Sequence, residues 1–187
     1  MAKVYAFTAD GMEEVECLAV CDILRRAGVD TKLVSIMGRK EIVGSHGFKI
    51  EADCLFEEIS DDADVLFLPG GLKGTENLKA HEGLAEMLKA HAAAGKRLAA
   101  ICAAPTVLGA AGLLNGRKAA CYPGCEDGLT GAEVLTDRVV EDGNITTSRG
   151  VGTAIPFALS LISQLFSPQK AEEIRESIVY GHGPVKA

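Results

Sequence analysis

Residues 98–109, LAAICAAPTVLG, decide the fold class, because they join two kinds of secondary structure with almost no linker. The run 96–102 is mostly small and apolar, which is typical of a strand buried inside a sheet. A helical pattern follows at once over 104–114, so Cys102 stands at the junction. A buried strand that runs directly into a helix is typical of an α/β protein with a mostly parallel sheet.

The same order of strand and helix recurs on both sides of this stretch. Apolar strands are predicted at 4–9, 31–37 and 63–71, and helices at 12–28, 76–95, 153–166 and 168–181. Residues 138–148 predict a hairpin around an Asp-Gly turn, and 40–53 a hairpin or an excursion from the main sheet. The pattern predicts one domain over residues 1–187, built as a three-layer α/β/α sandwich.

Composition excludes several classes of function. The chain is 48% apolar and 24% charged, and no apolar run approaches the roughly 18 residues that a membrane span requires. The N-terminus lacks the pattern of a secretory signal, so we expect a cytoplasmic protein whose six cysteines are free thiols. The net charge of −7, without a basic cluster, disfavours a nucleic-acid partner.

Cys102 has a functional and a structural interpretation. A cysteine in the first turn of a helix is close to the positive end of the helix dipole and to free amides, which favour the thiolate. The alanines around it, Ala99, Ala100, Ala103 and Ala104, are small enough for a sharp turn of the kind that presents a nucleophile. The alternative is an inert buried thiol, since free cysteine is often buried.

Two other strand ends are expected to meet Cys102, because the carboxyl ends of parallel strands share one edge of the sheet. An oxyanion on a Cys102 adduct needs two donors, and the amides of Ala103 and Gly71 are the candidates. The alternative for Gly70 and Gly71 is a plain turn.

Glu16 follows the first strand and is the candidate acid. Glu13, Glu14 and Glu16 can be solvated charges at a helix start. Glu16 can also turn inward if Val15 and Leu18 flank it on the apolar side of the helix. Burial beside a thiolate would raise its pKa, so that it could donate a hydrogen bond to the sulfur.

Four segments together resemble the DJ-1/PfpI superfamily, most closely its DJ-1/YajL/ThiJ branch. They are DGMEEVE (10–16), LFLPGG (66–71), AAICAAP (99–105) and EDGNITTSRGVGTAIPFAL (141–159). The resemblance covers about residues 3–167. It implies a flavodoxin-like sandwich, a homodimer and an easily oxidised nucleophile at Cys102. It also implies a protonated carboxyl at Glu16 and oxyanion donors at Gly71 and Ala103. The activities of the family include glyoxalase, deglycase and redox-regulated chaperone action.

The sequence departs from the family pattern in two places. DJ-1-type members carry a histidine where this chain has Tyr122, a lack that YajL-like members share. PfpI-type peptidases carry a histidine directly after the nucleophile, where this chain has Ala103, so a peptidase is disfavoured. His46 stands where DJ-1-like proteins carry an arginine, and it can bind an anionic group, act as a base or be a surface histidine.

The remaining cysteines and histidines carry weaker predictions. The spacings of Cys17 with Cys21 and of Cys121 with Cys125 are not those of a zinc knuckle, so we expect packing in a core or interface and no metal. The other expectations are a secondary oxidation target at Cys125, a loop position for Cys54, solvent exposure for His81 and His91, and no assignment for His182.

The leading prediction is a cysteine-dependent enzyme that acts on reactive carbonyls, either small molecules or glycated amino acids and proteins. Cys102 would attack the carbonyl carbon, Glu16 would donate and accept the proton, and no cofactor would be needed. Gly70, His46 and Tyr122 are the expected substrate contacts. The alternative is a redox-sensing chaperone whose Cys102 is oxidised to the sulfinate without carbonyl turnover.

Overall fold

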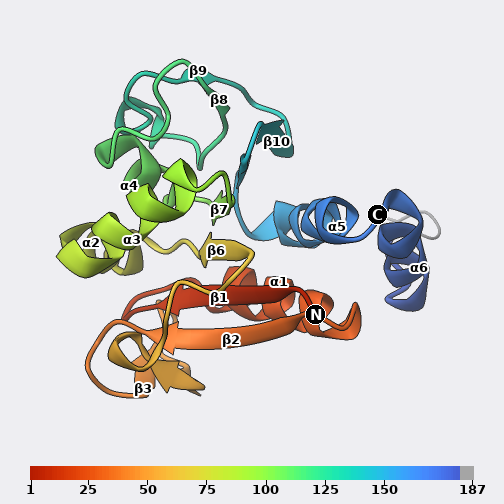
Figure 1. Cartoon of the computed structure of the whole chain (residues 1–187), viewed down its shortest axis with the longest axis horizontal. Helices are drawn as coiled ribbons and strands as arrows, with labels where there is room; N and C mark the ends of the chain where they lie inside the picture. The colour runs from red at the N-terminus through yellow and green to blue at the C-terminus, as the bar shows by residue number, and fades with distance from the viewer. Residues whose placement is uncertain (182–187) are drawn as a thin grey trace.

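A seven-stranded sheet forms the centre of the molecule (Figure 1). The structure, a computed structural model, describes residues 1–181, so His182 and the rest of the predicted domain lie outside the described residues. In spatial order the strands are β10 (Val139–Asp142), β11 (Ile145–Ser148), β7 (Arg97–Ile101), β6 (Val65–Leu68), β1 (Lys3–Thr8), β2 (Asp30–Ser35) and β5 (Cys54–Leu55). Neighbouring strands are parallel except at the β10–β11 hairpin.

The order of the parallel strands identifies the topology. The chain passes through β1, β2, β6, β7 and β11 in sequence, and these strands lie side by side as β2-β1-β6-β7-β11. This is the 2-1-3-4-5 order of flavodoxin-like sheets, in which ligands bind beyond the carboxyl ends of the strands.

Helices cover both faces of the sheet (Figure 1). One layer contains α1 (Glu14–Arg26), α5 (Ala154–Leu165) and α6 (Pro168–Ser177), and the other contains α2 (Leu72–Ala80), α3 (Glu82–Ala93) and α4 (Pro105–Ala110). Side chains alternate between the two layers along each strand: Val4 and Ala6 pack in the core below α1, whereas Tyr5 and Phe7 pack in the core on the opposite face. The predicted three-layer α/β/α sandwich is therefore confirmed.

Short elements flank the central sheet. The segment 40–53 forms the antiparallel pair β3 (Glu41–Val43) and β4 (Lys49–Glu51), which is the predicted hairpin. A second small sheet pairs β8 (Lys118–Ala119) with β9 (Glu133–Val134). Three short 3-10 turns complete the fold at Phe56–Glu58, Glu126–Gly128 and Val151–Thr153. Among residues 1–181, each helix is too short or too polar to cross a lipid bilayer.

The prediction of one long helix over 76–95 is wrong, because the segment contains α2 and α3. His81 separates them: its backbone is extended, with φ −86° and ψ 98°, and its Nδ1 accepts a hydrogen bond from the Leu84 amide at 3.0 Å. The imidazole thus caps α3, so that a side chain begins a new helix in the middle of a helical pattern. The predicted helix over 104–114 also ends early, at Ala110, before Gly112 turns the chain with φ +75°.

Two further expectations are corrected. His91 is not exposed: it lies in the last turn of α3 with its side chain fully buried, and its Nδ1 lies 2.6 Å from Asp61 Oδ1. Cys54 begins the edge strand β5 and does not lie in a loop, because it pairs with Val34. All six cysteines are free, and Cys17, Cys21 and Cys121 are buried, the first two in the core below α1 and the third in the core on the opposite face.

Candidate active site

Cys102 occupies a sharp turn between β7 and α4. Its φ is +66°, a left-handed conformation that costs a non-glycine residue about 1–2 kcal/mol. Neighbouring segments hold this turn on both sides: the Cys102 amide donates to the Ser148 carbonyl at 3.0 Å, and the Cys102 carbonyl accepts from the Tyr122 amide at 2.8 Å. The strain and the bonds that maintain it lift the thiol out of the sheet at its carboxyl edge.

Glu16 reaches this thiol from the first turn of α1. The side chain is fully buried, and Oε2 accepts a hydrogen bond from the Gly70 amide at 3.1 Å, whereas Oε1 is buried without a hydrogen-bond partner among residues 1–181. The expected reason for this burial is wrong, since Val15 and Leu18 are 52% and 41% exposed. The helix turns those two side chains outward, and the loop around Gly70 covers Glu16.

Gly70 allows the acid and the thiol to meet. A Cβ at this position would lie 2.3 Å from Glu16 Oε2, 2.5 Å from Cys102 Cβ and 3.0 Å from Cys102 Sγ. These separations are below van der Waals contact, so any side chain at residue 70 would push the two groups apart.

The two groups influence each other's acidity. Burial raises the pKa of Glu16 to about 7, helped by the charge of Glu13 and opposed by hydrogen bonds from Cys102 and Gly70. Burial and the charge of Glu16 raise the pKa of Cys102 to about 12, against the expectation that the helix start alone would favour a thiolate. A proton on Glu16 removes the negative charge that opposes the thiolate, so the two side chains compete for one proton.

The amides expected to form an oxyanion hole face the sulfur. Hydrogen bonds from the Gly71 and Ala103 amides lower the pKa of Cys102, in opposition to burial and to Glu16. Gly71 has φ +90°, and a Cβ there would lie 2.3 Å from the Gly11 carbonyl oxygen. The left-handed turn and the close approach to Gly11 therefore both require glycine at this position.

A pocket of about 710 Å³ opens above Cys102. It is lined by Asp10, Gly11, Glu13, Glu16, Val43, Gly44, Ser45, His46, Gly71, Leu72, Lys73, Cys102, Tyr122 and Val151. Tyr122 is 50% exposed beside the site, its ring 3.3 Å from a Cβ placed on Gly150. The structure thus brings together five of the predicted residues, Cys102, Glu16, Gly71, His46 and Tyr122, with Gly70 and Ala103 beneath the pocket.

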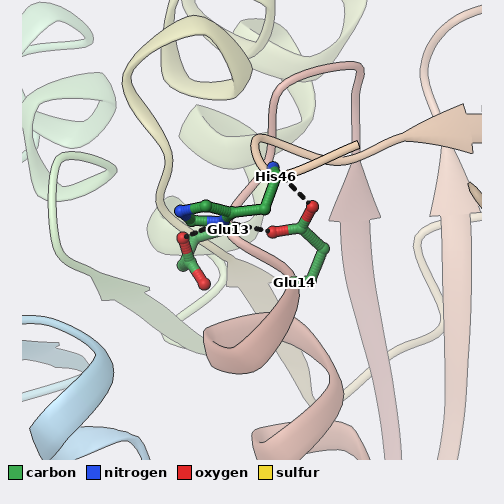
Figure 2. Close-up of side chains that lie close together, drawn as sticks. All are labelled: Glu13, Glu14 and His46. Atoms are coloured by element: carbon green, nitrogen blue, oxygen red, sulfur yellow. Dashed lines mark hydrogen bonds and ion pairs between the residues drawn. The ribbon is translucent and has the colours of Figure 1, made fainter. Parts of the chain in front are cut away.

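His46 lies at the mouth of the pocket, between two carboxyl groups (Figure 2). Its amide donates to Glu14 Oε1 at 2.7 Å, its Nδ1 lies 3.0 Å from Glu14 Oε2, and the Nδ1–Glu13 Oε2 distance is 3.4 Å. The hydrogen bond to Glu14 and the charges of Glu13 and Glu14 raise the pKa of His46. His46 is therefore an exposed histidine that its neighbours hold in place.

Glu13 and Glu14 are buried, which corrects the expectation of solvated charges at the helix start. Glu13 accepts from the Val15 amide at 3.2 Å, and its Oε2 lies 3.1 Å from Ser45 Oγ, whose single hydroxyl hydrogen is within reach of both Glu13 and Glu14. Burial raises the pKa of Glu14, but hydrogen bonds from His46 and Ser45 outweigh it and lower the pKa to about 2. Glu13, Glu14 and His46 each offer a ligand atom within 4.8 Å of the others, and Ser45 and His46 hold the Glu14 oxygens with hydrogen bonds.

The sequence analysis missed several pocket residues, among them Ser45, Leu72 and Lys73. One signal was available for Ser45: it lies between Gly44 and His46, and a Cβ on Gly44 would lie 2.1 Å from Glu14 Oε1. A glycine beside polar residues therefore marked a close approach to a carboxylate. Cys125 lines a separate pocket of about 230 Å³ and packs against the core opposite that of Cys102.

Comparisons with known proteins place the whole chain in one family. The model of the DJ-1/PfpI family matches residues 2–164. Protein DJ-1 homolog A of Arabidopsis thaliana is 41% identical over 180 residues, which cover 94% of this chain and 46% of the relative. This chain thus spans about half the length of that relative. A protein named deglycase from Pyrococcus abyssi is 37% identical over 153 residues, covering 80% of this chain and 91% of the relative.

A solved structure extends the likeness to three dimensions. Oxidized DJ-1 of Toxoplasma gondii superposes with a TM-score of 0.93 and 36% identity, covering 97% of this chain and 100% of that chain. The agreement over nearly the whole length confirms the flavodoxin-like fold that the resemblance implies.

Proposed function

The chain belongs to the DJ-1/PfpI family, and from that premise we propose that it is a cysteine-dependent enzyme of reactive carbonyls, of the glyoxalase or deglycase type. The observation that carries the proposal is the left-handed turn at Cys102 with Glu16 packed beside it across Gly70. Such a constellation joins a nucleophile to an acid whose pKa lies near neutrality, which suits general acid–base catalysis. The deglycase name of the Pyrococcus abyssi relative supports the same chemistry.

The first step at Cys102 forms a bond between sulfur and carbon. A hemithioacetal or hemiaminal adduct first breaks its C–S or C–N bond in the pocket, which releases the thiol or amine and restores the 2-oxoaldehyde. With the shared proton on Glu16, the Cys102 thiolate attacks the aldehyde carbon of this 2-oxoaldehyde. The carbonyl electron pair moves to oxygen, where the Gly71 and Ala103 amides stabilise the alkoxide and Glu16 supplies the proton.

The remaining steps regenerate the thiol. The Glu16 carboxylate removes the proton from the carbon bound to sulfur, which produces an enediol, and returns it to the neighbouring carbon. The hydroxyl proton passes from the oxygen on the first carbon to the oxygen on the second, and the hemithioacetal becomes the thioester of a 2-hydroxy acid. Water then releases the hydroxy acid, such as lactate or glycolate, and restores the Cys102 thiol. Because Tyr122 stands where a histidine base would assist, we expect modest turnover.

Substitutions at Cys102 and Glu16 test this mechanism directly. The parent protein is incubated with the methylglyoxal hemithioacetal of N-acetylcysteine, and the formation of lactate is followed. Cys102→Ser and Glu16→Gln should each lower kcat/KM by at least about 100-fold, as is usual for loss of a nucleophile or of a positioned acid. Gly152→Ala is a control, because a Cβ there meets nothing within 4 Å. If both active-site variants match the parent, the mechanism is wrong.

The same residues also support a redox-sensing chaperone, and the oxidized state of the Toxoplasma gondii relative favours this second candidate. Peroxide would oxidise the Cys102 thiolate to a sulfenate with release of water, and a second equivalent would produce the sulfinate. A protonated Glu16 could then donate a hydrogen bond to a sulfinate oxygen. Peroxide-treated protein that gains the ability to hold an unfolded client, without any carbonyl turnover, would support this function over the enzyme.

The protein is proposed to act as a homodimer. Val15 and Leu18 are one turn apart on the outward face of α1, and Phe48 on the adjoining hairpin is 65% exposed. Large exposed apolar side chains of this kind are typical of surfaces that a partner covers. Sedimentation of the parent and of Leu18→Asp should show a dimer that the charge weakens. The proposed cytoplasmic location is a separate question for imaging of a tagged chain.

A further inference from the structure

One charged side chain in the active-site pocket has no role in the mechanism above. Lys73 lies on the first turn of α2 and lines the pocket together with Cys102, Glu16 and His46. The side chain is exposed, so its ammonium group is open to a bound molecule.

The other charged residues of the pocket are already engaged. Asp10 accepts hydrogen bonds from Arg39 and, at 3.0 Å, from the Val43 amide. Glu13 accepts a hydrogen bond from the Val15 amide and lies 3.4 Å from His46 Nδ1, and His46 is hydrogen-bonded to Glu14. Since a charge that is already paired contributes little to a ligand, these groups leave few free charges at the mouth.

Lys73 differs from them. Within residues 1–181 its ammonium group makes no hydrogen bond and no ion pair within 4.0 Å. Burial raises the pKa of Asp10. Hydrogen bonds from Val43 and Arg39 and the charges of Arg39 and Lys73 outweigh the effect of burial, so the positive charge of Lys73 helps to lower this pKa. Asp10 is nevertheless bound to Arg39 and does not capture the lysine. Lys73 is therefore the cation of this pocket that remains available to a ligand.

The backbone fixes the stem of Lys73 in the wall of the pocket that contains Cys102. A Cβ on Gly11 would lie 2.6 Å from Lys73 Cβ, so the lysine stem packs directly on the Gly11 backbone. The Gly74 amide donates to the Gly11 carbonyl at 3.1 Å, which ties this turn of α2 to the same loop. Gly71, two residues before Lys73, presents its amide to Cys102. The lysine stem thus leaves the backbone two residues after one oxyanion donor, in the same wall of the pocket.

We propose that Lys73 determines specificity by binding a carboxylate on the substrate. The inference rests on the proposed function and narrows its substrate class to carbonyl adducts of molecules that carry a carboxylate, such as free amino acids and short peptides. A single unpaired ammonium group matches a singly charged carboxylate, whereas a phosphate usually recruits several donors. The pocket has a volume of about 710 Å³. It therefore leaves space for such an adduct, although the adduct is much larger than methylglyoxal alone.

Alkylation of Cys102 tests the charge preference without any need for carbonyl turnover. Iodoacetate and iodoacetamide both transfer a two-carbon group to the thiolate with loss of iodide, and they differ in the carboxylate. The two rate constants at Cys102 are measured by mass spectrometry of its peptide, at low salt. Replacing Lys73 with glutamine should lower the ratio of the iodoacetate rate to the iodoacetamide rate by about three- to fivefold, the effect of one exposed charge pair.

Matched variants isolate the position of the charge. Lys79→Gln removes the same charge from the same helix, but Lys79 lines the separate pocket of Cys125, so the ratio should stay at the parent value. Lys73→Arg should keep most of the ratio, and high salt should reduce the difference between the parent and Lys73→Gln. The proposal is overturned if Lys73→Gln leaves the ratio unchanged, or if Lys79→Gln lowers it as much.

A second measurement links the charge to the substrate. The methylglyoxal hemithioacetals of N-acetylcysteine and of N-acetylcysteine amide differ only in the carboxylate. Lys73→Gln should raise KM for the first about three- to fivefold and leave kcat for both unchanged. If the alkylation ratio responds to Lys73 but neither adduct is turned over, carboxylate binding stands and the proposed enzyme fails. If both adducts are turned over and Lys73→Gln changes neither KM nor the alkylation ratio, the enzyme stands and the role of Lys73 fails.

Discussion

Glu14 and Glu16 lie two residues apart in the first turn of α1, and both are buried, but their acidities move in opposite directions. The pKa of Glu16 is raised to about 7, whereas that of Glu14 is lowered to about 2. Glu14 lies at the mouth of the pocket, with Ser45 and His46, and Glu16 lies at its base, beside Cys102.

The difference between the mouth and the base comes from hydrogen bonds. Both carboxyl groups lose water on burial, which raises a pKa. Glu14 recovers stabilisation from three donors: the His46 amide, the His46 imidazole and the Ser45 hydroxyl. Glu16 is fully buried, and the hydrogen bonds from Cys102 and the Gly70 amide do not outweigh that burial, while Oε1 has no hydrogen-bond partner among residues 1–181. The start of α1 therefore holds one carboxyl group that stays ionised, Glu14, and one that can carry a proton, Glu16. The loops that cover the two side chains cause the difference.

Adding a methyl group at Gly70 should disturb Glu16 and leave Glu14 in place, with the largest effect of the changes considered on stability and turnover. In Gly70→Ala the new Cβ would overlap Glu16 Oε2 and Cys102 Cβ, so the base of the pocket must open while the mouth stays intact. We expect a loss of about 3 kcal/mol in the free energy of unfolding, measured in urea, and loss of turnover. The matched control is Gly152→Ala, whose Cβ meets nothing within 4 Å and should change stability by less than about 1 kcal/mol. Equal stabilities for the two variants would contradict the close packing described for Gly70.

The pH dependence of stability should reveal Glu16. In the unfolded chain its carboxyl group loses a proton near its ordinary pKa of 4.5, but in the folded protein only near 7. The folded state therefore holds the extra proton between these values, and stability should fall by about 3 kcal/mol as pH rises from 4.5 to 7. Urea unfolding at several pH values measures this slope. Glu16→Gln should remove most of it, and a variant that retains the full slope would show that another group causes the change.

Glu14 should behave in the opposite way. Its lowered pKa contributes stability that is present above pH 4.5 and is lost as pH falls towards 2. Glu14→Gln should cost about 1–2 kcal/mol at pH 7, because the neutral amide accepts hydrogen bonds less strongly than the carboxylate. Glu86→Gln, an exposed site on α3, is the control and should change little. A Glu14 variant as stable as this control would show that the hydrogen bonds at the mouth contribute no net stability.

His46→Ala should have the smallest effect of these changes. It removes the imidazole that donates to Glu14 but keeps the hydrogen bond from the backbone amide, so the pKa of Glu14 should rise part of the way towards its ordinary value. Carboxyl NMR titration measures that shift. The loss of stability should be smaller than for Glu14→Gln, since the imidazole is 67% exposed. An unchanged pKa at Glu14 would assign its low value to Ser45 and the backbone amides alone.

Local patterns predicted much of this arrangement correctly. Apolar runs marked the parallel strands, because strands covered on both faces bury almost every residue. The glycine pair after β6 and the small residues around Cys102 marked close approaches of the backbone. The inward turn of Glu16 was also expected, but for the wrong reason, because Val15 and Leu18 face outward.

Other features depended on contacts between distant segments. The break between α2 and α3 arises from an imidazole that caps a helix, which a pattern of apolar spacing does not reveal. Glu13 and Glu14 resemble ordinary solvated charges in the sequence, and only the hairpin carrying Ser45 and His46 buries them. In the sequence Lys73 similarly resembles any surface lysine. Only the structure reveals that the neighbouring charges are paired and that Lys73, among residues 1–181, has no hydrogen bond or ion pair.

The sequence by itself determined the order of strands and helices, the mostly parallel sheet and the position of Cys102 at a strand end, because these follow from periodicity and from short-range sterics. The tertiary structure alone decided the acidity of each group in the site. Glu14, Glu16 and Cys102 all lie at the start of a helix, but their pKa values depend on how far the fold buries them and on which amides, hydroxyls and charges it brings within a few ångströms. Those neighbours are distant in the sequence, and their distances are set only when the layers pack.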